Sequence, residues 1–185
     1  EAYDLAATFL TSAREAAAER LTAAVMAELG PLKLERARFR VALEPIEGRR
    51  GPDGVETVRF QIATNAGTDF GPLDAIASGG ELARFALAMK AALAGREDML
   101  QPVMIFDEVD QGVGGAVADA IGERLSRLAQ SNQILVVTHS PQVAARGRSH
   151  WLIAKSHDGL VTRTGVRPLD SAERQGDVVV VDRAQ

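Results

Sequence analysis

The segment from Pro102 to Asp110, PVMIFDEVD, constrains the fold of this chain more than any other. Pro102 to Phe106 is a short, continuous apolar run that begins at a proline and is followed by charge. Such a run is typical of a strand that is buried on both faces of a parallel sheet. The segment therefore predicts an α/β fold in which this strand is buried on both faces.

Acidic side chains follow this strand directly, at Asp107, Glu108 and Asp110. Neighbouring carboxylates repel each other and resist desolvation, so a chain that places them at the end of a buried strand usually has a cation or a proton to handle. Open α/β sheets bind their ligands at this edge. A strand ending in Asp-Glu is the Walker B pattern, in which the first acid holds Mg²⁺ on a nucleotide and the second orients the attacking water. The alternative is an acidic surface turn, and this segment alone does not separate the two.

Composition limits the class of protein. The chain has 185 residues and is 46% hydrophobic, which is enough for one sizeable core with an arm. It has no Cys and three scattered His, so we expect no disulfides or ligand cluster and a cytoplasmic setting. The net charge of −4 argues against binding nucleic acid over the whole chain, although a local basic patch stays open.

Neither a membrane span nor a signal peptide is predicted. No apolar run approaches the roughly 20 residues that a spanning helix needs, so we expect a soluble chain without a membrane partner. The chain begins at Glu1, without Met, inside a helical pattern. We therefore expect a piece of a longer protein.

Residues 1 to 29 are predicted to form one helix, which Gly30 and Pro31 end. Its apolar residues recur every three to five positions, in a narrow, Ala-rich stripe. The helix is either the last turns of a coiled coil or an ordinary amphipathic helix packed on the core. The stripe consists of Leu5, Phe9, Ala13, Ala16, Leu21, Val25 and Leu29.

A β-hairpin with a long loop is predicted next. Phe39, Val41 and Leu43 alternate with polar residues, and a second such run from Val55 to Ile62 follows the turn-rich loop 47–54. One strand face would carry three arginines, close to two more in the loop. Such a patch could contact DNA phosphates, or it could be a solvated edge strand with protective charge. These arginines are Arg36, Arg38, Arg40, Arg49 and Arg50.

A second candidate site opens the helix predicted between Ala75 and Gly95. Ser78, Gly79, Gly80 and Glu81 stand at its start, before an apolar face of Leu82, Phe85, Ala86, Met89 and Leu93. Ser78 and Glu81 could be a capping box. However, each glycine costs about 1 kcal/mol of helix propensity relative to Ala. Bare amides at a helix start instead favour a bound phosphate, because the helix dipole supplies about half a positive charge there.

A third candidate residue ends another buried strand. Gln133 to Thr138 is apolar, and His139 follows it, with Ser140 as N-cap and Pro141 as the first residue of a helix. His139 is expected at the same sheet edge as Asp107 and Glu108. A final strand pair is predicted over Trp151 to Ala154 and Leu160 to Val166.

Three segments in this order, ASGGELARFALAMKAAL, PVMIFDEVDQGVGG and VVTHSP, resemble the C-terminal lobe of an ABC-type ATPase head. The match covers about residues 75 to 155. Glu81 after the glycine pair and Val109 after Asp-Glu differ from transporter subunits and are similar to the RecN family of SMC-like DNA repair proteins. The resemblance implies a mixed, mostly parallel sheet flanked by helices, with a coiled-coil stub over 1–30, the head lobe over 31–170 and a tail over 171–185 to which no role is assigned.

The resemblance also implies a role for each candidate residue. Ser78, Gly79, Gly80 and Glu81 would be the signature motif, which contacts the γ-phosphate of ATP held by a second head. Asp107 would support Mg²⁺, commonly through water, and Glu108 would position or deprotonate the attacking water. Asp110 would lie in the D-loop, the segment that crosses to the second head. His139 would be the switch histidine at the γ-phosphate.

No part of the chain matches the phosphate-binding loop G-x-x-x-x-G-K-[ST]. In this family the loop belongs to an N-terminal lobe beyond the coiled coil, so the chain alone is expected neither to bind ATP tightly nor to hydrolyse it. The expected function is half of the ATP-hydrolysing head of a protein that repairs DNA double-strand breaks, with DNA and a second head as partners. The alternatives are a transporter nucleotide-binding subunit and a non-hydrolysing module that bridges DNA.

Overall fold

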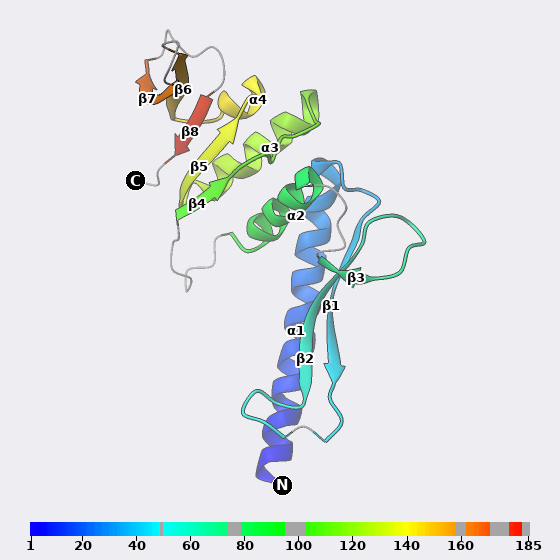
Figure 1. Cartoon of the computed structure of the whole chain (residues 1–185). Coiled ribbons are helices and arrows are strands. Elements are labelled where there is room, and N and C mark those ends of the chain that lie inside the picture. Colours follow the sequence, from blue (N-terminus) through cyan, green and yellow to red (C-terminus); the bar gives the residue numbers. More distant parts are fainter. Residues whose placement is uncertain (49, 74–78, 95–102, 158–161, 171–177, 183–185) are drawn as a thin grey trace.

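A computed structural model describes residues 1–48, 50–73, 79–94, 103–157, 162–170 and 178–182, and only the backbone of 154–157, 162–164 and 178–182. A five-stranded sheet and its helices form a head. A long helix and a β-hairpin extend from this head side by side and form an arm, with the N-terminus at the free end of the helix (Figure 1). The predicted α/β fold is confirmed.

The long helix, α1, spans Ala2–Leu29 and is followed by the 3₁₀ turn η1, Gly30–Leu32. The predicted helix and its end are therefore confirmed. The predicted apolar stripe is only partly buried. Val25 and Leu29 are buried, whereas Leu5 and Phe9 are 74% and 76% exposed. The stripe enters the core at its C-terminal end and leaves it along the arm.

The predicted hairpin is confirmed as β1, Arg38–Pro45, paired antiparallel with β2, Glu56–Ala63. A short strand, β3, Gly71–Pro72, joins the other side of β2. The hairpin is attached along α1 by side-chain hydrogen bonds. The Tyr3 hydroxyl donates to the Gly51 carbonyl at 3.2 Å, and Arg14 lies 2.8 Å from Glu56 Oε1. These contacts explain why the predicted stripe is exposed along the arm: the hairpin packs on a different side of α1.

The predicted arginine patch is split between the two ends of the hairpin. Arg38 and Arg40 are exposed where β1 starts, and Arg40 donates to Gln61 at 2.8 Å. Arg50 lies at the far end, where its guanidinium is 2.8 Å from Asp4 of α1 and 4.4 Å from the centre of the Tyr3 ring. The prediction that Arg50 lies near Arg38 and Arg40 is wrong, because the loop folds back onto the start of α1. Arg49 lies outside the described residues.

The attachment of the hairpin to α1 is expected to depend on pH. Hydrogen bonds from Arg14 and Thr11 lower the pKa of Glu56 below its ordinary value of 4.5. A carboxyl with a lowered folded pKa stabilises the fold above its unfolded pKa, and this contribution is lost as the pH falls through the folded value. We expect the gap in melting temperature between wild type and Glu56→Gln to shrink from about pH 6 to about pH 3, on either side of the ordinary carboxyl pKa. A gap that stays constant would contradict the assignment.

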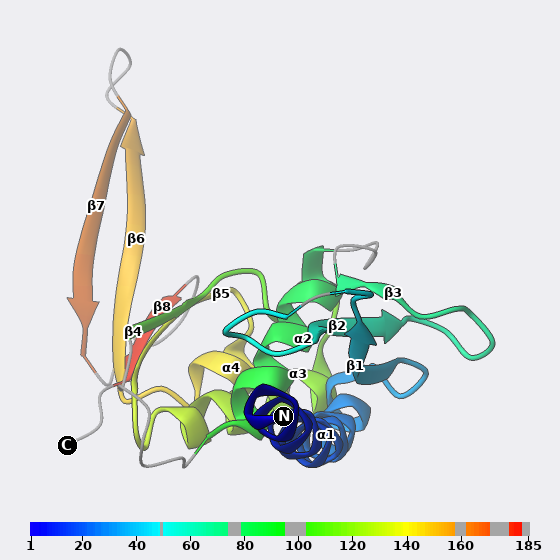
Figure 2. The same cartoon turned by 90° about the horizontal axis from the view of Figure 1, so that it is seen from below.

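The sheet of the head contains β4, Val103–Phe106; β5, Gln133–Thr138; β6, Ser149–His157; β7, Thr162–Leu169; and β8, Val178–Asp182, in the order β4-β5-β8-β6-β7. It is mixed, as predicted, but it is not mostly parallel. Among the described strands β4 and β5 pair parallel, and the three other pairings are antiparallel. The tail over 171–185, for which no role is predicted, contains β8, which inserts between β5 and β6. The predicted final strand pair is confirmed as β6 and β7, which extend away from the head (Figure 2).

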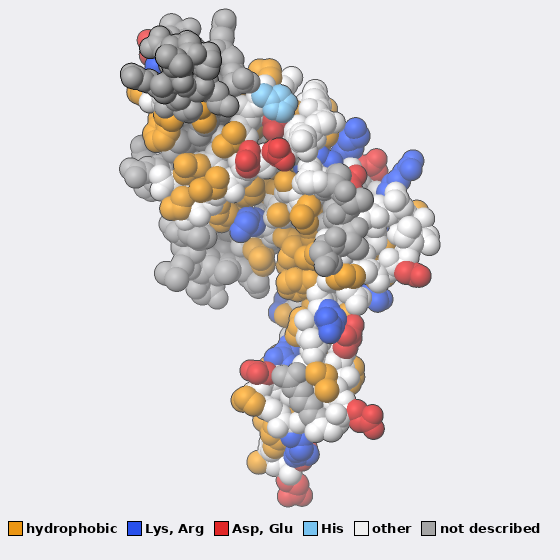
Figure 3. Space-filling view, viewed as in Figure 1, with side chains coloured by type: hydrophobic (Ala, Val, Ile, Leu, Met, Phe, Trp, Pro, Cys, Tyr) orange, Lys and Arg blue, Asp and Glu red, His pale blue; other side chains and the backbone are white. Residues whose placement is uncertain are grey.

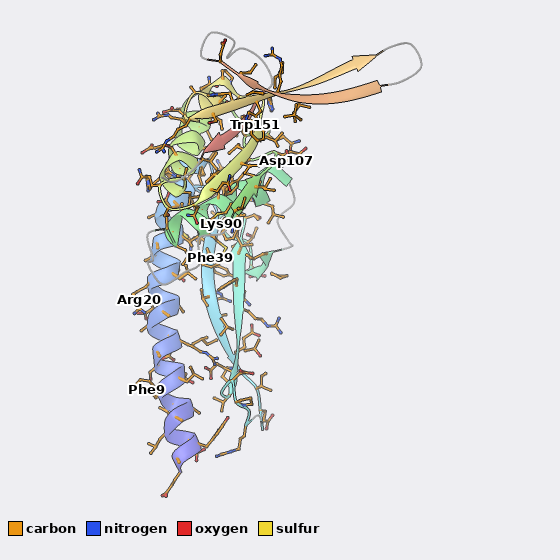
Figure 4. The ribbon with its side chains drawn as sticks, turned by 90° about the vertical axis from the view of Figure 1, so that its left-hand side faces the viewer. Phe9, Arg20, Phe39, Lys90, Asp107 and Trp151 are labelled. Carbon is orange, nitrogen blue, oxygen red and sulfur yellow. The ribbon has the colours of Figure 1, made fainter. Side chains whose placement is uncertain are left out.

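Helices cover one side of this sheet: α2, Gly79–Ala92; α3, Gly115–Leu128; and α4, Pro141–Ala144. The core lies between these helices, the sheet and the inner end of α1. Phe85 of α2 is 1% exposed, and its ring centre is 5.5 Å from that of Phe39. Phe39 lies where β1 enters the head (Figure 4).

The buried face of α2 differs from the predicted one. Phe85 is buried as expected, but Leu82 is 41% exposed and Arg84 only 6% exposed. The helix packs against both α1 and α3, so the side that is buried is set by two neighbours rather than by one apolar stripe. Gly95, the predicted end of this helix, lies outside the described residues.

Candidate functional site

Three predicted site residues lie at one edge of the sheet. Because β4 and β5 are parallel and Phe106 pairs with Val136, their carboxyl ends meet at the same edge. Asp107 and Glu108 follow β4, His139 follows β5, and all three are exposed. A histidine lies beside acidic side chains on the face shown in Figure 3, and Asp107 lies in the head, far from the free end of α1 (Figure 4).

Glu108 has an unusual backbone conformation. Its φ angle is +56°, in the left-handed region, which costs a residue with a side chain about 1–2 kcal/mol. The Glu108 carbonyl accepts a hydrogen bond from the Gln111 amide at 3.0 Å, so this residue starts a tight turn. Strain of this kind gathers at functional sites, where the surrounding structure holds it in place. The conformation therefore supports a functional role for Glu108.

Asp110 points into the protein. It is 1% exposed, and its Oδ2 accepts a hydrogen bond from the hydroxyl of Thr138, at the end of β5. The carboxylate is therefore turned away from the surface that a second molecule could reach. Gln111 and Gly112, which follow Asp110 in this turn, are exposed.

The first turn of α2 contains two glycines in different surroundings. Gly79 is exposed, and a Cβ atom built on it would meet nothing within 4 Å. Gly80 is buried, and a Cβ atom there would lie 3.2 Å from the Gln111 carbonyl oxygen. Gly80 thus allows α2 to approach the turn closely, whereas no described residue fills the space beside the Gly79 Cα. Glu81 is half-buried in the same turn, and Ser78 lies outside the described residues.

Sequence reasoning missed two residues that touch this turn. Arg84 donates from Nη1 to the Gln111 carbonyl at 3.2 Å, and burial lowers the pKa of Arg84, an effect that nearby Glu81 partly offsets. No sequence signal marked Arg84, because charged residues on a helix usually face solvent. Thr138 was detectable, since Ile134, Val136 and Thr138 alternate along β5 and are all buried.

The edge suits a metal ion that arrives with its substrate. Among the described residues no group of three or more His, Asp or Glu side chains could hold a metal. Mg²⁺ is commonly bound by one or two carboxylates together with substrate phosphates and water. The exposed carboxylate of Asp107, at the end of β4, fits that arrangement. In the described part of the chain no helix is long and apolar enough to cross a membrane.

Known proteins with similar sequences are DNA repair proteins. The chain is 46% identical over 176 residues to the DNA repair protein RecN of Streptomyces coelicolor, a match that covers 89% of this chain and 30% of that protein. It is 41% identical over 174 residues to RecN of Xylella fastidiosa, covering 94% of this chain and 31% of that protein. No protein-family model matches the chain. The chain therefore spans about 30% of the length of these relatives.

Solved structures with a similar fold are head domains. The Smc head domain of Pyrococcus yayanosii, with a coiled coil and joint, aligns with a TM-score of 0.57 and 22% identity, over 84% of this chain and 28% of that one. The Smc head domain of Pyrococcus furiosus, with an extended coiled coil and bound to the C-terminal domain of ScpA, aligns with a TM-score of 0.53 and 21% identity, over 83% of this chain and 36% of that one. The chain has the fold of part of an Smc head domain.

Proposed function

The chain belongs to the RecN family and spans about 30% of the length of the relatives that it matches. We propose that it forms the C-terminal lobe of the ATP-hydrolysing head of a DNA repair protein. The observation that carries this proposal is the meeting of Asp107, Glu108 and His139 at one sheet edge. At that edge one carboxylate can bind a metal ion, the second can orient a water molecule, and the imidazole can contact a phosphate.

Each residue of the edge has one proposed role in hydrolysis. Glu108 accepts a proton from the attacking water, and its strained backbone sets the direction in which its side chain leaves the turn. His139, exposed after β5, donates a hydrogen bond to the γ-phosphate. Asp107 would hold Mg²⁺, commonly through water, and a bound ion would supply positive charge against the phosphates.

The first turn of α2 is proposed to act on a second head. Ser78, Gly79, Gly80 and Glu81 would form the signature motif, which contacts the γ-phosphate of ATP bound mainly by the other copy. Gly79 is exposed at the start of α2, and this supports the role, because a helix start attracts anions. Asp110 would lie in the D-loop, and the exposed Gln111 and Gly112 of this segment, beside the helix, would face the second head. The complete protein would then close two heads around two nucleotides while bound to DNA.

An uncovered face of the sheet supports a missing lobe. Val103 and Ile105 of β4 are 59% and 69% exposed, and Val137 of β5 is 40% exposed. Trp151 of β6 lies on the same face, since Val137 and Trp151 both pair with position 179 of β8. β4 and β5 form the parallel part of the sheet, and parallel strands are normally covered on both faces. We infer that the lobe with the phosphate-binding loop covers this face and supplies the rest of the nucleotide site.

The arm supports the coiled-coil assignment in the same way. Leu5 and Phe9 are four residues apart, and both are exposed on a side of α1 that the hairpin does not cover. Neighbouring apolar residues on a helix surface are typical of a seam that pairs with a second helix. We infer that α1 continues into the coiled coil that joins the two lobes.

An ATP titration tests whether ATP binding requires the lobe that carries the phosphate-binding loop. We expect no saturable binding of labelled ATP to this chain alone, because the phosphate-binding loop and its lysine are missing. Binding should appear when the N-terminal lobe of the same protein is added. Tight binding by the chain alone would refute the proposal.

A further inference from the structure

Buried hydrogen bonds hold the turn that carries Glu108 from two sides. On one side the Thr138 hydroxyl donates to Asp110, and on the other side Arg84 donates to the Gln111 carbonyl at 3.2 Å. Asp110, Thr138 and Arg84 are 1%, 5% and 6% exposed. The turn is thus fixed between β5 and α2.

The direction of each bond follows from the groups involved. The Ser140 backbone N–H can only donate, and it does so to Thr138 Oγ1 at 2.9 Å. Thr138 therefore directs its own proton to Asp110. Ser140 is also the N-cap of α4, where its hydroxyl accepts from the Val143 amide at 3.5 Å. His139 lies between two residues that are both anchored, so its exposed side chain projects from a fixed backbone.

The contacts on α2 complete the connection. Gly80 lies against the same Gln111 carbonyl that Arg84 binds, so the first turn of α2 and the turn after Glu108 share one close contact. Hydrogen bonds and close packing thus join three regions that carry proposed site residues. These regions are the first turn of α2, the turn after β4 and the end of β5.

The network is not optimised for stability alone. Asp110 Oδ1 and Arg84 Nε are buried without a hydrogen-bond partner among the described residues. Buried polar atoms without partners are costly, and apolar side chains of similar size would fill the same space without that cost. Polar side chains at these positions are explained if their directional bonds set the geometry of the edge.

We propose that Thr138, Asp110 and Arg84 are positioning residues, which hold Glu108 and His139 at the correct separation and tie both to the first turn of α2. The inference rests on the proposed function. A displacement of about 1 Å at a catalytic group can lower the rate about 100-fold. Loss of these bonds should therefore lower kcat without weakening the binding of ATP.

The test is the ATPase activity of the complete protein with Thr138→Val, which keeps the shape of the side chain and removes the hydroxyl. We expect kcat to fall about 10- to 100-fold while KM for ATP changes less than about threefold, because the bond is needed for geometry and not for ATP contact. Thr138→Ser restores the hydroxyl and should restore kcat. Thr8→Val is the matched control, since the Thr8 hydroxyl donates to the Asp4 carbonyl on the exposed arm.

Two results would overturn the inference: a folded Thr138→Val protein with wild-type kcat, or a Thr138→Ser protein as slow as Thr138→Val. Should Thr138→Val not fold, Arg84→Met removes the other bond, and wild-type kcat in that variant has the same meaning. Glu108→Gln, measured in the same assay, distinguishes a failure of the proposed function from a failure of this inference. If Glu108→Gln keeps the wild-type rate, the proposed function is wrong and this inference falls with it. If only Glu108→Gln is slow, the inference alone is wrong.

Discussion

Replacing Glu108 with Gln in the complete protein is expected to slow ATP hydrolysis by roughly 100- to 10,000-fold, the usual contribution of a general base. The amide cannot accept the proton of the attacking water. The fold should be unaffected, because the Glu108 side chain is exposed and Gln has nearly the same size. ATP should still bind, so the variant should accumulate as a closed pair of heads with uncleaved nucleotide.

Phosphate release under saturating ATP measures this effect, and size-exclusion chromatography with ATP detects the trapped dimer. Glu47→Gln is the matched control, because Glu47 is an exposed acid in the hairpin loop, on the arm rather than in the head. It should hydrolyse ATP at the wild-type rate. A Glu108→Gln protein that hydrolyses ATP as fast as this control would rule out Glu108 as the base.

The second large effect is expected from Gly79→Ala. A Cβ atom at Gly79 meets nothing within 4 Å, so the chain should fold, and alanine should favour the helix by up to about 1 kcal/mol. In the closed dimer the same methyl group would stand between the bare amide and the phosphate of the other head. Loss of one such preorganised donor typically lowers the rate about 100- to 1,000-fold. Hydrolysis should therefore fall while the stability of the isolated chain holds or rises.

Gly80→Ala provides the contrast within the same helical turn. Its Cβ atom would lie 3.2 Å from the Gln111 carbonyl and 3.3 Å from Arg84 Nη1, so α2 or the turn must shift. Overpacking of this kind costs about 1–3 kcal/mol, and urea unfolding of the isolated chain should show the loss. If Gly79→Ala were less stable than wild type, or if it hydrolysed ATP normally, the assignment of Gly79 to the phosphate would be wrong.

Glu108, with its strained backbone, and the buried Asp110 belong to the same turn. In this turn Arg84 donates to the Gln111 carbonyl, and the Thr138 hydroxyl donates to the Asp110 carboxylate. A left-handed glutamate persists only when its neighbours hold it. The strength of these contacts and the direction of the Glu108 side chain are therefore linked, which is why the positioning residues and the base are tested in one series of variants.

Much of the site could be predicted because its signals are local. An apolar strand followed by Asp107 and Glu108, and a second one followed by His139, identify strand ends within a few residues of sequence. The parallel pairing of β4 and β5 then follows from the α/β pattern, and it brings these strand ends together. The N-cap at Ser140 was equally local, since its hydroxyl accepts from an amide three residues later.

The predictions that proved wrong concern residues whose neighbours come from distant parts of the chain. Leu82 belongs to an apolar stripe but is exposed, and Arg84 is buried, because α1 and α3 select which side of α2 they cover. Arg50 was expected near Arg38, but it binds Asp4, which lies 46 positions away in sequence. The strand β8 was not predicted, and it turned a sheet expected to be mostly parallel into one that is mostly antiparallel.

Most of the helices and strands, and the strand ends that carry Asp107, Glu108 and His139, are predictable from sequence, since periodicity, turns and caps act over a few residues. Packing between distant segments sets the rest: Asp110 faces inward to Thr138, Gly80 rather than Gly79 packs against the turn, and Val103 and Ile105 of β4 are exposed. A hydrophobic period tells that a face will be buried, but the partner that buries it is chosen by packing between segments far apart in the chain.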